Sequence, residues 1–339
     1  MVSNIKKYLI IRILGNDIPI IHSDTQTYEN LLFTVNNETN FENTDKIYLL
    51  NRIADKKKRS DIINLLNEYS ISYIEIPFVY DEFKKIPKLD DYIIRLYNYI
   101  INNNGILSGS QYKKVSKELF NYRIYLMNIN VARNYCIEYG KKKGYEWTFV
   151  LDSNSFFTDE YYNSIIKNIK KDTEYISIPQ IRLNEGQLLN EDIYLSPEKL
   201  ESLPEQEHQL GFKITSKYIF NKDLPYGSMN KAELLNALGI PGKWSEWGYD
   251  LKVLNLTPRK FDNVKYQILS KCIRLDSGKN NNNIKFNWKY RLIGVYLLIN
   301  NIENEYKEFD KINKYYIITL LIGILIVLYI YSLVFNKSV

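Results

Sequence analysis

Hydrophobic and polar positions along the first part of the chain follow a pattern that predicts strands separated by helices. The apolar runs Lys7–Leu14, Asp45–Leu50 and Ile71–Ile76 are typical of buried strands. Between them, Tyr28–Asn40 and Asp55–Tyr69 carry apolar residues at helical spacing. This order of strand, helix, strand, helix and strand predicts an α/β fold with a mostly parallel sheet and helices on both of its faces.

The rest of the chain shows further elements with the same two kinds of spacing. The clearest pair is a helix at Tyr122–Lys143 followed by a strongly apolar strand at Glu146–Leu151. Tyr80–Phe120 is polar and rich in tyrosine, so we expect helices there with a loop near Asn102–Ser110, and the acidic stretch Asn184–Gln209 is predicted to be irregular. The remaining expected elements are a helix at Asp159–Lys171, strands at Glu174–Ile178 and Phe212–Phe220, and helices at Lys231–Leu238 and Phe286–Ile302.

The last part of the chain carries a long run of residues without charge. Tyr315–Phe335 contains 21 residues, and a helix of that length covers the roughly 30 Å hydrocarbon core of a bilayer. Tyrosines lie near both ends of the run, where phenol rings favour the membrane interface. The alternative is a buried core helix, which would normally show a polar face. We therefore predict a single-pass membrane protein held by a C-terminal transmembrane helix.

The predicted topology leaves the N-terminal domain in the cytosol. Arg12 interrupts the first apolar run and no cleavage site follows, so a signal peptide is not expected. Cys136 and Cys272 are too few for a disulfide framework and suit a reducing compartment. The predicted divisions are a globular domain at 1–280, a membrane-proximal segment at 281–314, the transmembrane helix at 315–335 and a short tail at 336–339.

Charge adds two candidate contact surfaces. The formal net charge is +6, and short basic runs occur at Lys56–Arg59 and Lys141–Lys143. Most runs of this kind are solvated faces of helices or loops. The functional alternative is contact with a sugar phosphate, an anionic glycan or lipid headgroups. Nucleic acid is not an expected partner, because the sequence contains no helix–turn–helix, zinc-finger or aromatic RNA-binding motif.

The segment Asn130–Asn154 carries the clearest chemistry. Its helix and strand place Asp152 and Asn154 just after the strand, and ligands bind at the carboxyl ends of strands in open α/β sheets. Oxygen atoms from these two side chains are suitable ligands for Mg²⁺ or Mn²⁺, which are completed by substrate phosphates. Arg133 would balance the remaining phosphate charge. The alternative role of Asp152 is to cap a following helix.

Two other loops follow predicted strands and are candidates for nucleotide contact. Gly15, Asn16 and Asp17 come after the first strand, and Asn51 and Arg52 come after the second. The alternative is that both are simple turns, because Gly and Asn tolerate a positive φ.

A transfer to an acceptor hydroxyl needs a carboxylate as general base, and aromatic rings often stack on sugars. The candidate bases are Glu205, Glu207, Glu246 and Asp250. Trp244 and Trp247 would stack on a sugar ring or pack in the core. The two histidines, His22 and His208, are too far apart in sequence to indicate a zinc motif.

The order Ala132-Arg133-Asn134, then an apolar strand, then Leu151-Asp152-Ser153-Asn154, resembles the GT-A (Rossmann-like) glycosyltransferases, in particular the inverting family-2 type. The resemblance implies that Arg133 and Asn134 line a nucleotide-sugar site and that Asp152 and Asn154 hold a metal on the sugar diphosphate. Asn154 departs from the family, which more often has Asp there. An amide is a neutral and weaker ligand than a carboxylate.

A second resemblance covers roughly residues 8 to 278 and is to a poorly characterised, mostly bacterial group of glycosyltransferase-like domains. The matching stretches are Arg12–Pro19, Leu49–Ile53, Glu207–Phe212, Tyr226–Trp244 and Ile273–Gly278, together with the segment that ends at Asn154. The order of these stretches, rather than any single one, is specific. This resemblance supports the fold more than a particular reaction.

Two functions follow from these observations. The first is a membrane-anchored, metal-assisted glycosyltransferase that uses a nucleotide sugar. The second is a binding protein of the same fold with little or no activity, because its organisation faintly resembles that of the poxvirus envelope proteins that bind heparan sulfate. This resemblance implies that the N-terminal domain is exposed on a virion surface. Arg133 and Asp152 favour the enzyme, whereas Asn154 and the C-terminal run favour an attachment factor that binds a glycosaminoglycan.

Overall fold

The computed structural model describes residues 7–103, 107–182, 205–227, 230–242, 244, 257–275 and 287–335 of the chain. The chain divides into two compact units, Met1–Tyr296 and Leu297–Val339. The first unit contains the sheet. The domain limits predicted from the sequence stay predictions.

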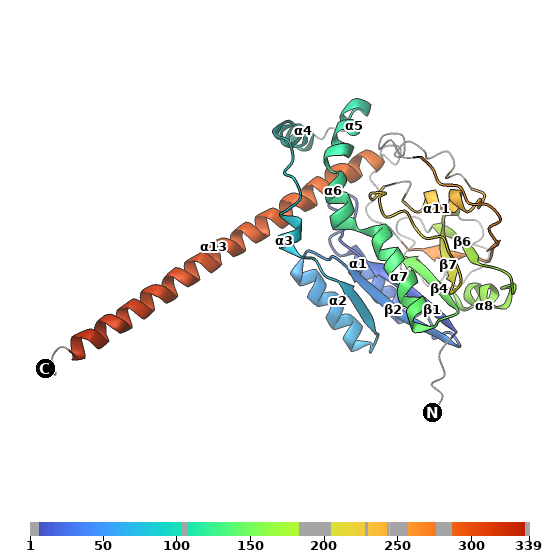
Figure 1. The fold of residues 1–339 in the computed structure, drawn as a ribbon, viewed down its shortest axis with the longest axis horizontal. Coiled ribbons are helices and arrows are strands. Elements are labelled where there is room, and N and C mark those ends of the chain that lie inside the picture. The colour runs from blue at the N-terminus through green and yellow to red at the C-terminus, as the bar shows by residue number, and fades with distance from the viewer. Residues whose placement is uncertain are drawn as a thin grey trace. The chain divides into compact units, whose positions relative to one another are not determined.

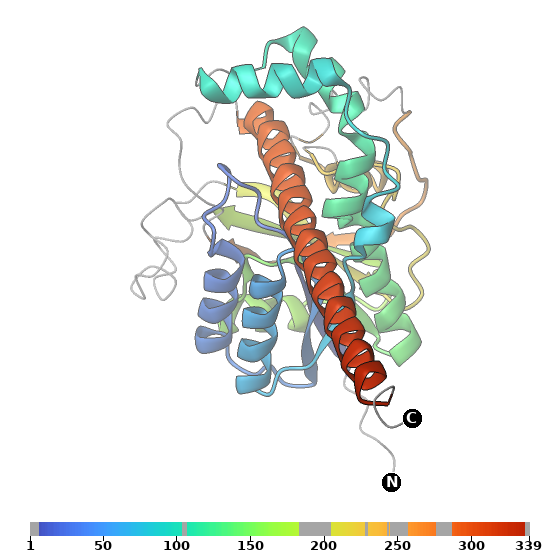
Figure 2. The same cartoon turned by 90° about the vertical axis from the view of Figure 1, so that its left-hand side faces the viewer.

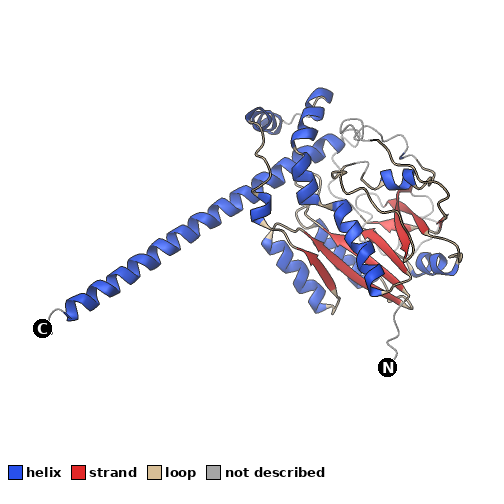
Figure 3. Ribbon diagram, viewed as in Figure 1, coloured by secondary structure: helices blue, strands red, loops and turns tan. Residues whose placement is uncertain are grey.

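Within the described residues, nine strands form one mixed sheet in the order β3-β2-β1-β4-β7-β6-β9-β5, with β8 paired to β6 (Figures 1 and 3). The block β3-β2-β1-β4 is parallel throughout, whereas β7 runs antiparallel to both β4 and β6. The expected α/β fold with a mostly parallel sheet is therefore confirmed. The strands are β1 (Tyr8–Leu14), β2 (Thr44–Asn51), β3 (Tyr73–Ile76), β4 (Trp147–Asp152), β5 (Ser155–Phe156), β6 (Tyr175–Arg182), β7 (Glu205–Lys213), β8 (Tyr266–Ile268) and β9 (Cys272–Arg274).

Helices cover both faces of this sheet. Alternate residues of a strand point to opposite faces, and in β1 Ile11 packs in a core with α7 and α11, whereas Ile10 packs in a core with α8. Figure 2 shows α1 and α2 side by side. The helices are α1 (Gln26–Asn37), α2 (Lys56–Glu68), α3 (Tyr80–Phe83), α4 (Asp91–Asn102), α5 (Gly109–Glu118), α6 (Phe120–Tyr122), the π-helix η1 (Arg123–Met127), α7 (Ile129–Lys143), α8 (Asp159–Lys167), α11 (Ala232–Ala237) and α13 (Asn287–Phe335).

The strand order reverses between β1 and β4. From β1 the sheet continues to β2 on one side and to β4 on the other, and Ile13 of β1 lies in register with Asp152 of β4. Leu14 pairs with Leu50 of β2. Because these strands are parallel, Gly15, Asn51 and Asp152 lie at one edge of the sheet, as the sequence predicts.

The expected boundaries are wrong in three places. The strand expected at Phe212–Phe220 is β7, which ends at Lys213 and begins at Glu205, inside the stretch expected to be irregular. Its polar start reads as a loop, but β7 is paired on both sides. The expected strand Glu174–Ile178 continues to Arg182 as β6. The helix expected at Tyr122–Lys143 is interrupted at Asn128, which has a φ of +43°.

The predicted transmembrane run lies in α13. Among the residues whose side chains the structure describes, no helix combines the length and the apolar character needed to cross a membrane. The side chains of residues 309–317, 323 and 327–335 lie outside the described part, and these include much of the predicted span. The membrane anchor stays a prediction.

Candidate functional site

Asp152, the last residue of β4, lies at the centre of a group of polar side chains. Its Oδ1 accepts a hydrogen bond from Arg133 Nη2 at 2.8 Å. Its Oδ2 accepts from Gln209 Nε2 at 3.0 Å and from Lys231 Nζ at 2.9 Å. The structure thus brings together the two residues that the sequence paired, Arg133 and Asp152, and adds two partners that the sequence did not predict.

Lys231 is a buried partner that contacts two carboxylates. Its side chain is 1% exposed, and its Nζ lies 2.9 Å from Asp152 Oδ2 and 3.5 Å from Glu207 Oε1. The side chains of Asp152 and Glu207 are 25% and 22% exposed. A buried ammonium therefore bridges two carboxylates that reach the surface, and a buried charge needs such pairing.

The charges around Asp152 set its protonation state. Burial by itself would raise the pKa of this carboxyl, because it disfavours the charged form. The positive charges of Lys231 and Arg133, with the hydrogen bond from Gln209, outweigh that effect and hold the pKa of Asp152 well below its ordinary value. Asp152 is therefore a carboxylate at neutral pH.

Several contacts fix the position of Arg133 on α7. Its Nη1 donates to Asn130 Oδ1 at 3.0 Å, and its guanidinium lies over the ring of Phe220 at 5.2 Å. The helix can approach β4 closely because of Gly140: a Cβ there would lie 1.9 Å from Thr148 Oγ1. A short distance between α7 and β4 allows Arg133 to reach Asp152.

Asn134, which follows Arg133 in the Ala-Arg-Asn segment, has its side chain hydrogen-bonded to the backbone of the protein. Its Nδ2 donates to Phe220 O, and its Oδ1 accepts from Phe220 N, both at 2.9 Å. This pair of bonds anchors residue 220 against α7. The predicted nucleotide contact of Asn134 stays a prediction, and these bonds do not favour it.

The asparagines after β1 and β2 are also used within the protein. Asn16 donates to Arg52 O at 2.8 Å and to Leu126 O at 3.1 Å. Asn51 donates to Met127 O at 2.8 Å and accepts from Asn128 at 2.9 Å. These hydrogen bonds connect the two loops to the end of η1 and so hold the loops at the carboxyl edge of the sheet in place.

The charged residues of the same loops are partly engaged. Asp17 accepts from Thr27 at the start of α1 and lies 3.3 Å from Lys58 Nζ. Arg52 has a φ of +47° and donates to Tyr125 O at 3.0 Å, with its guanidinium 4.0 Å from the centre of the Tyr125 ring. Arg52 Nε has no hydrogen-bond partner among the residues that the structure describes.

Gly15 is the position of these loops that leaves room for a ligand. In the described part of the chain, apart from Gly15 and its two chain neighbours, no atom would lie within 4 Å of a Cβ built on Gly15. The backbone after β1 is therefore open on that side, next to the edge where Asp152 lies. A ligand can approach such a main-chain segment closely.

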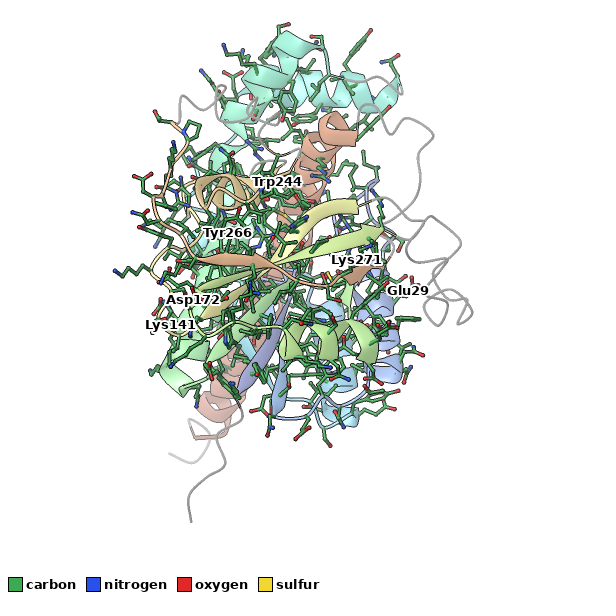
Figure 4. All side chains as sticks on the ribbon, turned by 90° about the vertical axis from the view of Figure 1, so that its right-hand side faces the viewer. Glu29, Lys141, Asp172, Trp244, Tyr266 and Lys271 are labelled. Atoms are coloured by element: carbon green, nitrogen blue, oxygen red, sulfur yellow. The ribbon has the colours of Figure 1, made fainter. Side chains whose placement is uncertain are left out.

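Of the four candidate bases, the structure describes the side chain of Glu207 alone, and it places that residue beside Asp152 through Lys231. The side chain of Glu205 lies outside the described part, as do Glu246, Asp250 and Trp247. Trp244, labelled in Figure 4, is buried in the core and donates to Ile240 O at 2.9 Å. Trp244 therefore packs in the core and does not face a sugar.

The contacts of the two predicted metal ligands fit a divalent ion poorly. Asp152 already accepts from three donors, and Asn154 is buried with its amide 3.4 Å from Leu275 O. Within the described residues, no three or more His, Cys, Asp or Glu side chains form a group that could hold a metal. The predicted metal contacts of Asp152 and Asn154 stay a prediction, and these bonds do not favour it.

The basic runs are engaged in ways that suit solvated helix faces. In the first run, Lys58 pairs with Asp17, and Arg59 forms a bidentate pair with Glu75 at 2.6 and 2.7 Å. In the second run, Lys141 donates to Ser216 O at 2.7 Å in the last turn of α7, where positive charge favours the helix end. These contacts give no indication of a glycan site.

His208 gives the site a measurable pH dependence. Burial and the neighbouring charge of Lys231 lower its pKa to about 4, and its Nδ1 lies 2.7 Å from Ser177 Oγ. The unfolded chain binds this proton below about pH 6.5, so protons favour unfolding between pH 6.5 and 4. We expect the free energy of unfolding to fall by about 2–3 kcal/mol from pH 7 to 4.5 because of this group.

Urea unfolding at a series of pH values measures that loss. The variant His208→Gln should flatten the dependence above pH 4.5, since Asp152, with its low pKa, keeps its charge in that range. A slope that is the same in both proteins would contradict the assignment.

No protein-family model and no curated protein matches the chain. Among solved structures, it is similar to a 4-diphosphocytidyl-2C-methyl-D-erythritol synthase from Anaerococcus prevotii, with 12% identity, 86% of this chain and 99% of that chain covered, and a TM-score of 0.30. It is also similar to a mannosyltransferase from Pyrobaculum calidifontis in complex with GDP-Man and Mn²⁺, with 7% identity, 81% and 58% covered, and a TM-score of 0.36. Both likenesses are distant. The glycosyltransferase resemblance in the sequence thus has distant structural counterparts, but no sequence family matches it or the poxvirus resemblance.

Proposed function

We propose that this chain binds a nucleoside diphosphate sugar at the carboxyl ends of β1 and β4 and transfers the sugar to an acceptor hydroxyl. The observation that carries the proposal is the convergence of Arg133, Lys231 and Asp152, from three separate segments, at this edge. In open α/β sheets a ligand binds where the strand order reverses, and β1 and β4 lie at that point.

The diphosphate is the part of the donor that this edge is suited to hold. The guanidinium of Arg133 is always charged, and its planar donors match phosphate oxygens. The ammonium of Lys231 has three N–H groups, and its contacts with Asp152 and Glu207 use two of them. Among the described residues the third has no partner, and in the proposed complex it donates to a phosphate oxygen. The open side of Gly15 allows the ligand to approach the backbone.

We assign Glu207 as the base, because it is the candidate carboxylate whose side chain the structure describes and it lies 3.5 Å from Lys231 Nζ. It accepts the proton of the acceptor hydroxyl while the acceptor oxygen forms its bond to the anomeric carbon of the sugar. The bond from that carbon to the diphosphate oxygen breaks, and the nucleoside diphosphate leaves with the electron pair. The cations at Arg133 and Lys231 stabilise the charge that develops on the leaving group.

Calorimetry with uridine and guanosine diphosphate sugars tests the binding step. Replacing Arg133 with glutamine removes one charged hydrogen-bond donor, so affinity should fall about 10- to 100-fold, or about 1.5–3 kcal/mol. The matched control is Arg59→Gln, because Arg59 lies on α2 in a pair with Glu75 and its side chain is 43% exposed.

The control variant should bind the donor as the wild type does. Equal affinity in the wild type and in Arg133→Gln would contradict the assigned site. If the chain binds no nucleotide sugar but binds heparin in a salt-sensitive way, the glycosaminoglycan-binding alternative replaces the enzyme.

A further inference from the structure

We propose that Lys231 supplies, as a fixed ammonium group, the positive charge that a divalent metal ion would otherwise supply at Asp152, so that the diphosphate binds without a metal. The idea rests on the proposed function, because it concerns the same site. It differs from the expectation drawn from the sequence, which gave Asp152 and Asn154 to Mg²⁺ or Mn²⁺.

The position of Lys231 is the first reason. Its Nζ lies between Asp152 Oδ2 and Glu207 Oε1, at 2.9 and 3.5 Å. A metal that bridged these two carboxylates would need about the same place, with metal–oxygen distances of roughly 2.0–2.1 Å. Two positive charges cannot share that space at low cost, since their repulsion is strong where water is excluded.

Lys231 is held in this position by its surroundings. Its side chain is 1% exposed, so protein atoms surround the ammonium in the absence of a ligand. Its backbone N–H donates to Asn230 Oδ1 at 2.8 Å, and α11 begins at the next residue. The backbone O of Asn230 accepts a hydrogen bond from Asn130 Nδ2 at 2.7 Å. Asn130 Oδ1 in turn accepts a hydrogen bond from Arg133. The two cations are thus positioned by one connected set of bonds.

The lone pairs of Asp152 are the second reason. A carboxylate offers about four acceptor sites, and Asp152 already receives three donors, two of them charged. Asn154 is buried and paired with Leu275: its side-chain Nδ2 donates to Leu275 O at 3.4 Å, and its backbone O accepts from Leu275 N at 2.8 Å. Both features point to a site that is neutralised by side chains.

Titration of the protein with Mn²⁺, UDP and GDP, with and without EDTA, tests this inference. In the wild type, nucleotide affinity should be the same with Mn²⁺ and with EDTA, and Mn²⁺ alone should show no bound signal in electron paramagnetic resonance. In Lys231→Ala, affinity in EDTA should fall about 10- to 100-fold. Mn²⁺ should then bind to the freed carboxylates of Asp152 and Glu207 and restore part of the affinity.

The matched control is Lys7→Ala, because Lys7 pairs with Glu146 near the other end of β1 and is 49% exposed. It should behave as the wild type in every titration. If Lys231→Ala does not fold, the Mn²⁺ titration of the wild type still decides the matter. Nucleotide binding that requires Mn²⁺, or Mn²⁺ binding by the wild type alone, would overturn the role of Lys231 and leave the proposed function standing. Absence of nucleotide binding under every condition would overturn the proposed function, while the Mn²⁺ titrations alone would still test Lys231.

Discussion

Replacing Asp152 with alanine should lower the free energy of unfolding by about 3–5 kcal/mol, because it leaves the buried Arg133 without a carboxylate and leaves Lys231 with only the longer contact to Glu207. The side chains of Lys231 and Arg133 are 1% and 5% exposed, and both lie within 3 Å of an Asp152 oxygen. Urea unfolding of the wild type and the variant measures the difference.

A matched control separates this effect from the loss of any ion pair. Glu75→Ala breaks the pair with Arg59, whose side chain is 43% exposed, and pairs of that kind contribute about 0–1 kcal/mol. A double variant, Asp152→Leu with Lys231→Met, should be more stable than Asp152→Ala. The double variant removes the ammonium of Lys231 together with the carboxylate of Asp152, whereas Asp152→Ala leaves that ammonium buried. If Asp152→Ala costs no more than Glu75→Ala, the ion group around Asp152 is not as tightly coupled as described.

Replacing Glu207 with glutamine should reduce turnover about 100- to 10,000-fold, the range that general base catalysis typically contributes. The amide keeps the shape of the side chain and an oxygen for Lys231, but it cannot accept the proton of the acceptor. Affinity for the nucleotide sugar should therefore change little. Release of the nucleoside diphosphate measures turnover, and calorimetry measures binding.

Glu146→Gln serves as the control for this variant, since Glu146 pairs with Lys7 and is 41% exposed. It should keep both turnover and binding. A Glu207→Gln protein that retains full turnover would show that another group accepts the proton. A loss of binding equal to the loss of turnover would show instead that Glu207 positions the donor.

The parallel part of the fold was accessible from the sequence because its strands are continuous apolar runs. β1, β2 and β4 are buried from both faces of the sheet, and such strands differ clearly from the amphipathic helices between them. The first part of β7 was missed because it begins with Glu205 and other polar residues, and only its long-range pairing with β4 and β6 makes it a strand. Pairing of this kind leaves no local signal.

The candidate site shows the same division. Asp152 and Arg133 were found because each has a local setting, the end of an apolar strand and the start of a helix. Lys231 and Gln209 are 79 and 57 residues away from Asp152 in the chain, and nothing in their neighbourhood marks them as partners of a carboxylate. The one indication was their place within Tyr226–Trp244 and Glu207–Phe212, two of the stretches that carried the family resemblance.

For the asparagines, the residue type suggested contact with a nucleotide, but the structure shows their side chains in hydrogen bonds within the protein. Asn16, Asn51 and Asn134 follow strands or open a helix, where amides often contact nucleotides. In the structure their amides bind main-chain groups of neighbouring segments. A buried amide needs such partners, and the sequence gives no sign of which partner it will find.

A crystal structure of the protein with UDP or GDP, grown in EDTA, tests the central claim most directly. We predict that the diphosphate lies at the carboxyl ends of β1 and β4, next to Gly15, with its oxygens bound by Arg133 and Lys231. Nucleotide bound anywhere else on the chain, or at this edge with a phosphate that contacts neither cation, would contradict the account.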